Sequence, residues 1–74
     1  MGEMRVIGKE GDTKVIWDTR NEIEIDAAKK QFDSLVDKGF TAYRVDKDGD
    51  KDGKMKSFDK TAGKIILVPA IAGG

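Results

Sequence analysis

The sequence predicts an α+β domain in which one helix packs on a mixed sheet of four to five strands. Three observations support this class. Two short β-branched runs flank a turn near the start, one stretch has apolar residues at helical spacing, and a continuous apolar run lies near the end. With 74 residues and a hydrophobic fraction of 38%, the chain has enough apolar material for one core and not for two.

A hairpin is predicted at the N-terminus. Residues 4–8 and 13–19 are rich in β-branched and aromatic side chains, and the segment between them contains a glycine. This pattern is typical of two antiparallel strands joined by a short turn. The apolar residues do not alternate cleanly, so the pattern leaves open which face is buried. Trp17, the one tryptophan, is expected in the core.

A helix is predicted over residues 24–38, approximately. Its apolar residues recur at helical spacing and form one face: Ile25, Ala28, Phe32, Leu35 and Val36. Asp26 is the expected N-cap, because its carboxylate can accept from free N–H groups of the first turn. Gly39 is the expected residue just beyond the helix, where a left-handed conformation favours glycine.

Three strands are predicted after the helix, at residues 40–46, 55–58 and 64–69. A charged loop of Asp, Lys and Gly separates the first two, and a turn at residues 59–63 separates the last two. The last strand is apolar at consecutive positions, which indicates a strand that is central in its sheet or covered on both sides. Pro69 is expected to end its hydrogen-bond ladder.

The order of these elements resembles the β-grasp, or ubiquitin-like, fold. The last seven residues, VPAIAGG, are similar to the end of the molybdopterin-synthase small subunit and related sulfur carriers. The resemblance implies a ubiquitin-like domain over residues 1–72 and a flexible tail of Gly73 and Gly74. It also implies that an ATP-dependent activating enzyme adenylates the Gly74 carboxylate. Residues without a Cβ let such a tail enter a narrow channel.

The composition excludes several kinds of chemistry. The chain has no cysteine and no histidine, which removes thiol nucleophiles, imidazole bases and ordinary zinc sites. No motif fixes a catalytic residue, so the protein is expected not to be an enzyme. Fourteen basic residues balance fourteen acidic ones without a basic stripe, which argues against nucleic-acid binding. With no long apolar run and no apolar signal region, we expect a soluble, cytoplasmic protein that does not enter a membrane. A monomer is also expected.

The acidic segment 48–59 has the spacing of a calcium-binding loop. Asp48, Asp50, Asp52 and Asp59 fall at positions 1, 3, 5 and 12 of an EF-hand loop. Lys56, however, stands at position 9, where a ligand or its bridging water belongs, and the flanks are predicted strands rather than helices. Two interpretations stay open: a weak Ca²⁺ site with these four ligands, or a charged turn. No other cofactor is predicted.

Three functions follow from these features. The leading hypothesis is a small ubiquitin-like carrier or modifier whose C-terminal glycine is activated by a partner enzyme. The alternative is a non-catalytic protein-interaction or scaffold module, within a phage or other multi-subunit assembly, with an inert tail. Tyr43 and Arg44 are then the candidate partner surface, on the open face of the sheet; the alternative is that they are ordinary edge residues. The second alternative is a weak calcium-binding module that uses the 48–59 loop.

Overall fold

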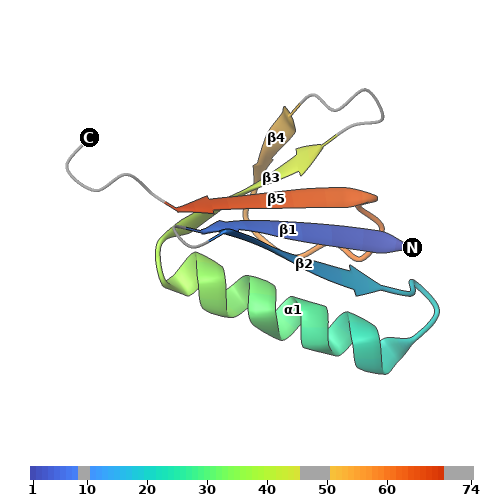
Figure 1. Ribbon diagram of the computed structural model, residues 1–74. Coiled ribbons are helices and arrows are strands. Elements are labelled where there is room, and N and C mark those ends of the chain that lie inside the picture. Colours follow the sequence, from blue (N-terminus) through green and yellow to red (C-terminus); the bar gives the residue numbers. More distant parts are fainter. Residues whose placement is uncertain (9–10, 46–50, 70–74) are drawn as a thin grey trace.

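The computed structural model describes residues 1–8, 11–45 and 51–69. In chain order the elements are β1 (Gly2–Gly8), β2 (Gly11–Trp17), α1 (Glu22–Asp37), β3 (Phe40–Val45), β4 (Lys51–Met55) and β5 (Lys64–Pro69). The strands form one five-stranded mixed sheet, and α1 lies across one of its faces (Figure 1). The predicted α+β class is confirmed, and the arrangement is β-grasp-like, with an N-terminal hairpin and one helix on the sheet.

The strand order is β2-β1-β5-β3-β4, which places β5 in the middle of the sheet. β5 runs parallel to β1 and antiparallel to β3, and Leu67 lies beside Val6 on one side and Ala42 on the other. These three side chains are buried. Since the side chains of a strand alternate between its two faces, this register defines the face that α1 covers. The prediction of a central final strand is confirmed.

The core lies between this face and α1. Its largest fully buried side chains come from both layers: Met4, Trp17, Phe32, Ile65 and Leu67. The predicted apolar face of the helix is confirmed, because Ala28 and Phe32 are buried and Ile25, Leu35 and Val36 pack against the core. Full burial of a side chain of this size contributes about 1.5–3 kcal/mol to the free energy of unfolding. The packing of α1 on the sheet is therefore the main source of stability.

The helix begins four residues before the predicted N-cap. Asn21 is the N-cap, and its side-chain oxygen accepts from the N–H groups of Ile23 and Glu24 at 3.0 and 3.2 Å. The Glu24 carboxylate reaches back and accepts from the N–H of Asp18 at 2.8 Å. The prediction of Asp26 as N-cap is therefore wrong, because an Asn with a Glu three residues later already satisfies the first turn.

The helix ends as the sequence predicts. Gly39 has a φ of 104°, in the left-handed region, and its N–H donates to the carbonyl of Val36 at 3.0 Å. This geometry satisfies a carbonyl that the helix would leave unpaired. Among the described residues, no helix combines the length and apolar character needed to cross a membrane.

The segment between β3 and β5 differs from the prediction. The strand lies at Lys51–Met55, mostly within the segment assigned to a loop, and shares only Met55 with the strand predicted at residues 55–58. Phe58 instead sits in the connection to β5, with its ring centroid 5.0 Å from Trp17 and 5.7 Å from Phe32. The Phe58 ring thus packs against the aromatic part of the core. To place it there, the chain leaves the sheet after Met55.

Gly2 gives a direct test of this packing. It lies opposite Trp17 in the β1–β2 pair, and a Cβ at Gly2 would approach the indole carbons to 2.1 Å. The ring has little room to move, because its Nε1 donates to the carbonyl of Lys60 at 3.1 Å. We expect Gly2→Ala to lower the free energy of unfolding by about 1–3 kcal/mol in urea denaturation.

Gly63→Ala is the matched control, because a Cβ at Gly63 would meet no atom within 4 Å. We expect it to change the free energy of unfolding by less than about 0.5 kcal/mol. Equal effects of the two substitutions would contradict the close contact between Gly2 and Trp17.

Candidate functional site

The face of the sheet turned away from α1, called the open face below, carries a cluster of charges. Glu3 on β1 lies 3.8 Å from each of three cations: Arg5 on the same strand, Lys14 on β2 and Lys64 on β5. The cationic side chains keep 40–50% of their surface exposed. One carboxylate is thus shared by three cations. The cluster is positive overall, and its groups remain accessible to a partner.

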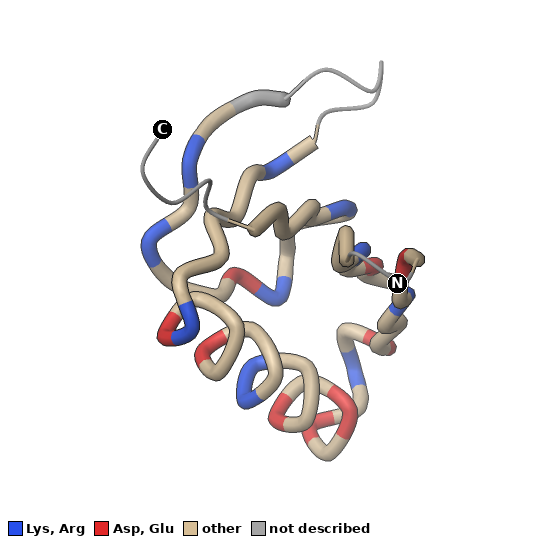
Figure 2. The backbone as a smooth tube through the Cα atoms, turned by 60° about the vertical axis from the view of Figure 1, so that its left-hand side comes forward, with Lys and Arg blue, Asp and Glu red and all other residues tan. Residues whose placement is uncertain are grey.

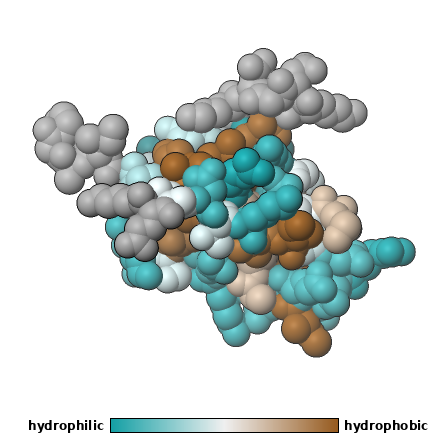
Figure 3. Space-filling model, in the orientation of Figure 1, coloured by the Kyte–Doolittle hydropathy of each residue, from teal (hydrophilic) through white to brown (hydrophobic). Residues whose placement is uncertain are grey.

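Apolar side chains lie beside these charges. On the open face, Tyr43 is opposite Ile66 of β5 on one side and Lys54 of β4 on the other. Ile16 lies opposite Glu3 and is 49% exposed. The open face therefore combines apolar and cationic groups across all five strands. On the side of the molecule that Figure 3 shows, which also includes α1, apolar side chains are interleaved with hydrophilic ones rather than gathered in one broad area.

Arg44 does not share this face with Tyr43. Neighbouring residues of a strand point to opposite sides of a sheet. Arg44 lies opposite the buried Ile65, on the side that α1 covers. Its guanidinium pairs with the carboxylate of Asp59 in the β4–β5 connection. The expectation that Arg44 lies on the open face is wrong, and only Tyr43 of the predicted pair belongs to that surface.

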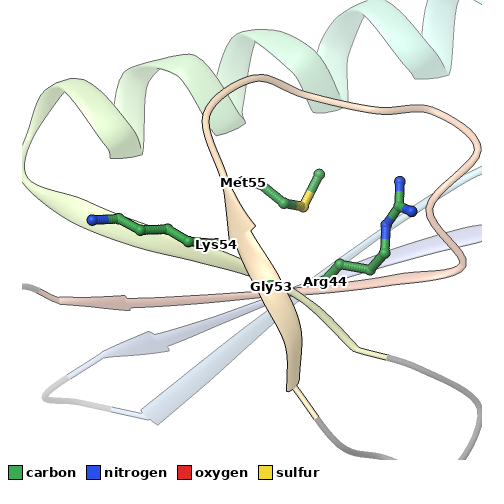
Figure 4. Close-up of a pocket in the computed structure, with 4 residues that line it drawn as sticks. All are labelled: Arg44, Gly53, Lys54 and Met55. Atoms are coloured by element: carbon green, nitrogen blue, oxygen red, sulfur yellow. The ribbon is translucent and has the colours of Figure 1, made fainter.

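A hollow of about 250 Å³ lies between β3 and β4, lined by Arg44, Gly53, Lys54 and Met55. Figure 4 shows the side chains of Arg44 and Met55 on the same side of the sheet as α1, with Lys54 directed away from them. Among the described residues, no buried side-chain polar atom lacks a hydrogen-bond partner. No orphaned group therefore indicates a ligand here, and Arg44 already has Asp59 as its partner.

Asp59 is held by several donors. Its Oδ1 accepts from the N–H of Thr61 at 2.9 Å and from the Thr61 hydroxyl at 2.6 Å, while Oδ2 accepts from Arg44. The two hydrogen bonds from Thr61, followed by the charge and hydrogen bond of Arg44, lower the pKa of Asp59 below its ordinary value of 3.8. Through its ion pair with Arg44, the Asp59 carboxylate thus links the β4–β5 connection to β3.

This arrangement bears on the predicted calcium site. Asp48 and Asp50 lie outside the described residues, as does the side chain of Asp52. Asp59 is described, and its oxygens are occupied by Thr61 and Arg44. Within the ranges that the structure describes, no three acidic side chains gather as metal ligands. Calcium binding stays a prediction, and an ion at Asp59 would have to compete with the Arg44 guanidinium.

The predicted tail, Gly73 and Gly74, also lies outside the described residues. The last described residue is Pro69, which ends β5 and lies opposite Phe40 of β3. The chain therefore reaches the tail from a strand that has neighbours on both sides. No family model, curated protein or solved structure matches this chain.

Sequence reasoning did not find the cluster around Glu3. Its members come from β1, β2 and β5, and Lys64 is far from Glu3 along the chain. Each is an ordinary charged residue at an exposed strand position. Only the register, which places Glu3 beside Lys64 and Arg5 beside Lys14, brings them together. The cluster could have been predicted only from the correct pairing register of β1, β2 and β5.

The lowered pKa of Asp59 predicts a pH dependence of stability. A depressed pKa in the folded state stabilises the protein above the unfolded pKa, and this contribution is lost as the pH falls through the folded value. We expect Asp59→Asn to destabilise the protein at neutral pH. The difference in unfolding free energy from the wild type should shrink as the pH falls below about 4.

Urea denaturation across this pH range measures the effect. Thr61→Ala removes the hydroxyl donor but keeps the backbone N–H, so it should show a smaller pH-dependent difference of the same sign. A difference between wild type and Asp59→Asn that stays constant over the acidic range would argue against the role of this carboxylate.

Proposed function

We propose that the protein is a ubiquitin-like carrier whose Gly74 carboxylate is activated by a partner enzyme, and that it is not itself an enzyme. One observation carries this proposal: the strand that leads to Gly73 and Gly74 is the middle strand of the sheet, with β1 on one side and β3 on the other. An edge strand can fray from its one neighbour, whereas a central strand is held on both sides.

The pairing of β5 extends to its end. Leu67 lies beside Val6 of β1, and Pro69 lies opposite Phe40 of β3. The segment after Pro69 thus starts from a fixed point on the domain. A partner that binds the sheet would meet the start of this segment at a constant place, and would then have to orient the Gly74 carboxylate in its own active site.

The proposed reaction leaves the catalytic work to the partner. A carboxylate oxygen of Gly74 attacks the α-phosphorus of ATP and displaces pyrophosphate, forming an acyl-adenylate. A thiol, sulfide or amine then attacks the carbonyl carbon and releases AMP. The chain itself has no cysteine or histidine to serve as nucleophile or imidazole base, which fits a carrier better than an enzyme.

The proposal requires a free Gly74 carboxylate in the cell, either as encoded or after processing. The test is to recover the protein with an N-terminal tag from its own cells and to determine its intact mass and C-terminal peptides. We expect a terminal thiocarboxylate or Gly74 joined to a lysine of another protein. Deletion of Gly73 and Gly74 should abolish both species, while Gly63→Ala, at an unhindered site, should retain them.

Two results would argue against the carrier. One is a Gly74 carboxylate that stays unmodified under all growth conditions. The other is a conjugate that persists after Gly73 and Gly74 are deleted, because its linkage would then involve another residue.

A second candidate function is a protein-interaction or scaffold module that uses the open face. The observation that favours it is the cluster of Arg5, Lys14 and Lys64 around Glu3, on the same face as Tyr43 and Ile66. Tyrosine and arginine are among the residues that most often dominate protein interfaces, and this face carries one of each, Tyr43 and Arg5. The partner would present acidic and apolar groups, and the tail would play no part.

This candidate predicts which substitutions weaken binding. A partner purified from the native cell should bind the Tyr43→Ala, Lys64→Ala double variant at least about tenfold more weakly than wild type in calorimetry. Lys30→Ala, on the exposed side of α1, should leave the affinity within about twofold. If the open-face double variant bound the partner with the affinity of the wild type, the interface would lie elsewhere.

A further inference from the structure

The two edges of the sheet differ in regularity. At one edge, β4 has five residues, and its register with β3 shifts between Arg44 and Val45. Such irregularity discourages the addition of another strand. At the other edge, β2 has seven residues, and its register with β1 runs without a shift from the Gly2–Trp17 pair to the Gly8–Gly11 pair. β2 is therefore the edge better suited to pair with a further strand.

The outer part of β2 is also accessible. On the helix side, Thr13 is exposed and Val15 only half-buried, whereas Trp17 at the end of the strand is fully buried. α1 thus covers one end of β2 and leaves the other uncovered. In Figure 1, β2 forms the border of the sheet. In the part of the chain that the structure describes, no backbone hydrogen bond joins β2 to a segment other than β1.

The charges on β2 are self-complementary. Asp12 and Lys14 lie two residues apart and point to the open face, opposite Ile7 and Arg5 of β1. Asp12 is exposed, and its side chain makes no hydrogen bond or ion pair with the described residues. Lys14 is half-exposed, and its ammonium lies 3.8 Å from the nearest Glu3 oxygen. Both groups are available to a neighbour.

We propose that a second copy of this chain pairs with the outer edge of β2. The two β2 strands run antiparallel about a two-fold axis that places Thr13 opposite Thr13. This register sets Asp12 of each copy opposite Lys14 of the other, so that one symmetric contact makes two ion pairs between directly opposed residues. It joins the two sheets into a single ten-stranded sheet, twice the five strands of one chain.

The pairing has a consequence for the open face. A two-fold axis perpendicular to the joined sheet keeps the open faces of both copies on the same side. The cation clusters around the two Glu3 residues then border one continuous surface, which offers two copies of the same partner site. The β2 contact is independent of the tail. A dimer also differs from the expected monomer, because the free edge of β2 becomes visible only with the strand pairing.

The test measures self-association of the full chain by sedimentation velocity at concentrations up to about 1 mM, since an interface of one strand pair is small and the dimer weak. Asp12→Lys and Lys14→Asp each replace two attractions with two repulsions, and each should weaken the dimer about tenfold or more. The double swap, Asp12→Lys with Lys14→Asp, should restore the affinity to within about threefold of wild type. Lys54→Asp, at an open-face lysine on β4, the other edge strand, should leave the affinity unchanged.

Two outcomes overturn the proposal. One is a wild-type protein that stays monomeric over the whole concentration range. The other is a dimer whose affinity is unchanged by Asp12→Lys and by Lys14→Asp, because the contact between the two copies then lies elsewhere. A measurement without variants complements the test: amide signals of residues 11–17 should shift with concentration in the wild-type NMR spectrum, while those of β4 should not. Shifts confined to β4 would also overturn the β2 contact.

Discussion

The indole of Trp17 ties together parts of the chain that are far apart in sequence. Its ring is fully buried, packs against Phe58 at 5.0 Å and fits closely against Gly2. Its Nε1 donates to the carbonyl of Lys60, so the β4–β5 connection is held to the hairpin. An aromatic pair and a hydrogen bond each contribute about 0.5–1.5 kcal/mol. The connection that Trp17 holds leads directly into β5, the strand on which the sheet is centred.

Much of this fold could be predicted because its signals are local. The apolar face around Phe32, the left-handed Gly39 and the apolar run of β5 each appear within a short stretch of sequence. The errors arose where two signals competed. Asp26 and Asn21 are both good caps, and only Asn21 has a Glu at the right spacing. Phe58 looks like a strand residue by propensity, but burial against Trp17 decided its place.

The candidate surface was harder to predict, because it depends on strand register. Tyr43 and Arg44 are adjacent in the sequence and lie on opposite faces, so one joins Ile66 and the other joins Asp59. Lys64 reaches Glu3 only because β5 lies parallel to β1. A shift of one residue in either strand would send these side chains to the other face. Composition alone, with equal numbers of acidic and basic residues, gives no sign of this local excess of cations.

The ion pairs on the helix side of the molecule differ in length from those on the open face. On α1, acidic residues gather near the start of the helix (Figure 2), and lysines pair with acids one turn away, as in Lys29–Asp33 at 2.7 Å. On the face of the sheet that α1 covers, Arg44 forms an ion pair with Asp59. On the open face, by contrast, the three contacts to Glu3 are each 3.8 Å long and solvent-exposed, and such contacts contribute at most about 1 kcal/mol each. Loss of the Glu3 carboxylate would therefore remove only weak, exposed contacts, whereas loss of the Asp59 carboxylate would also remove its bonds to Thr61.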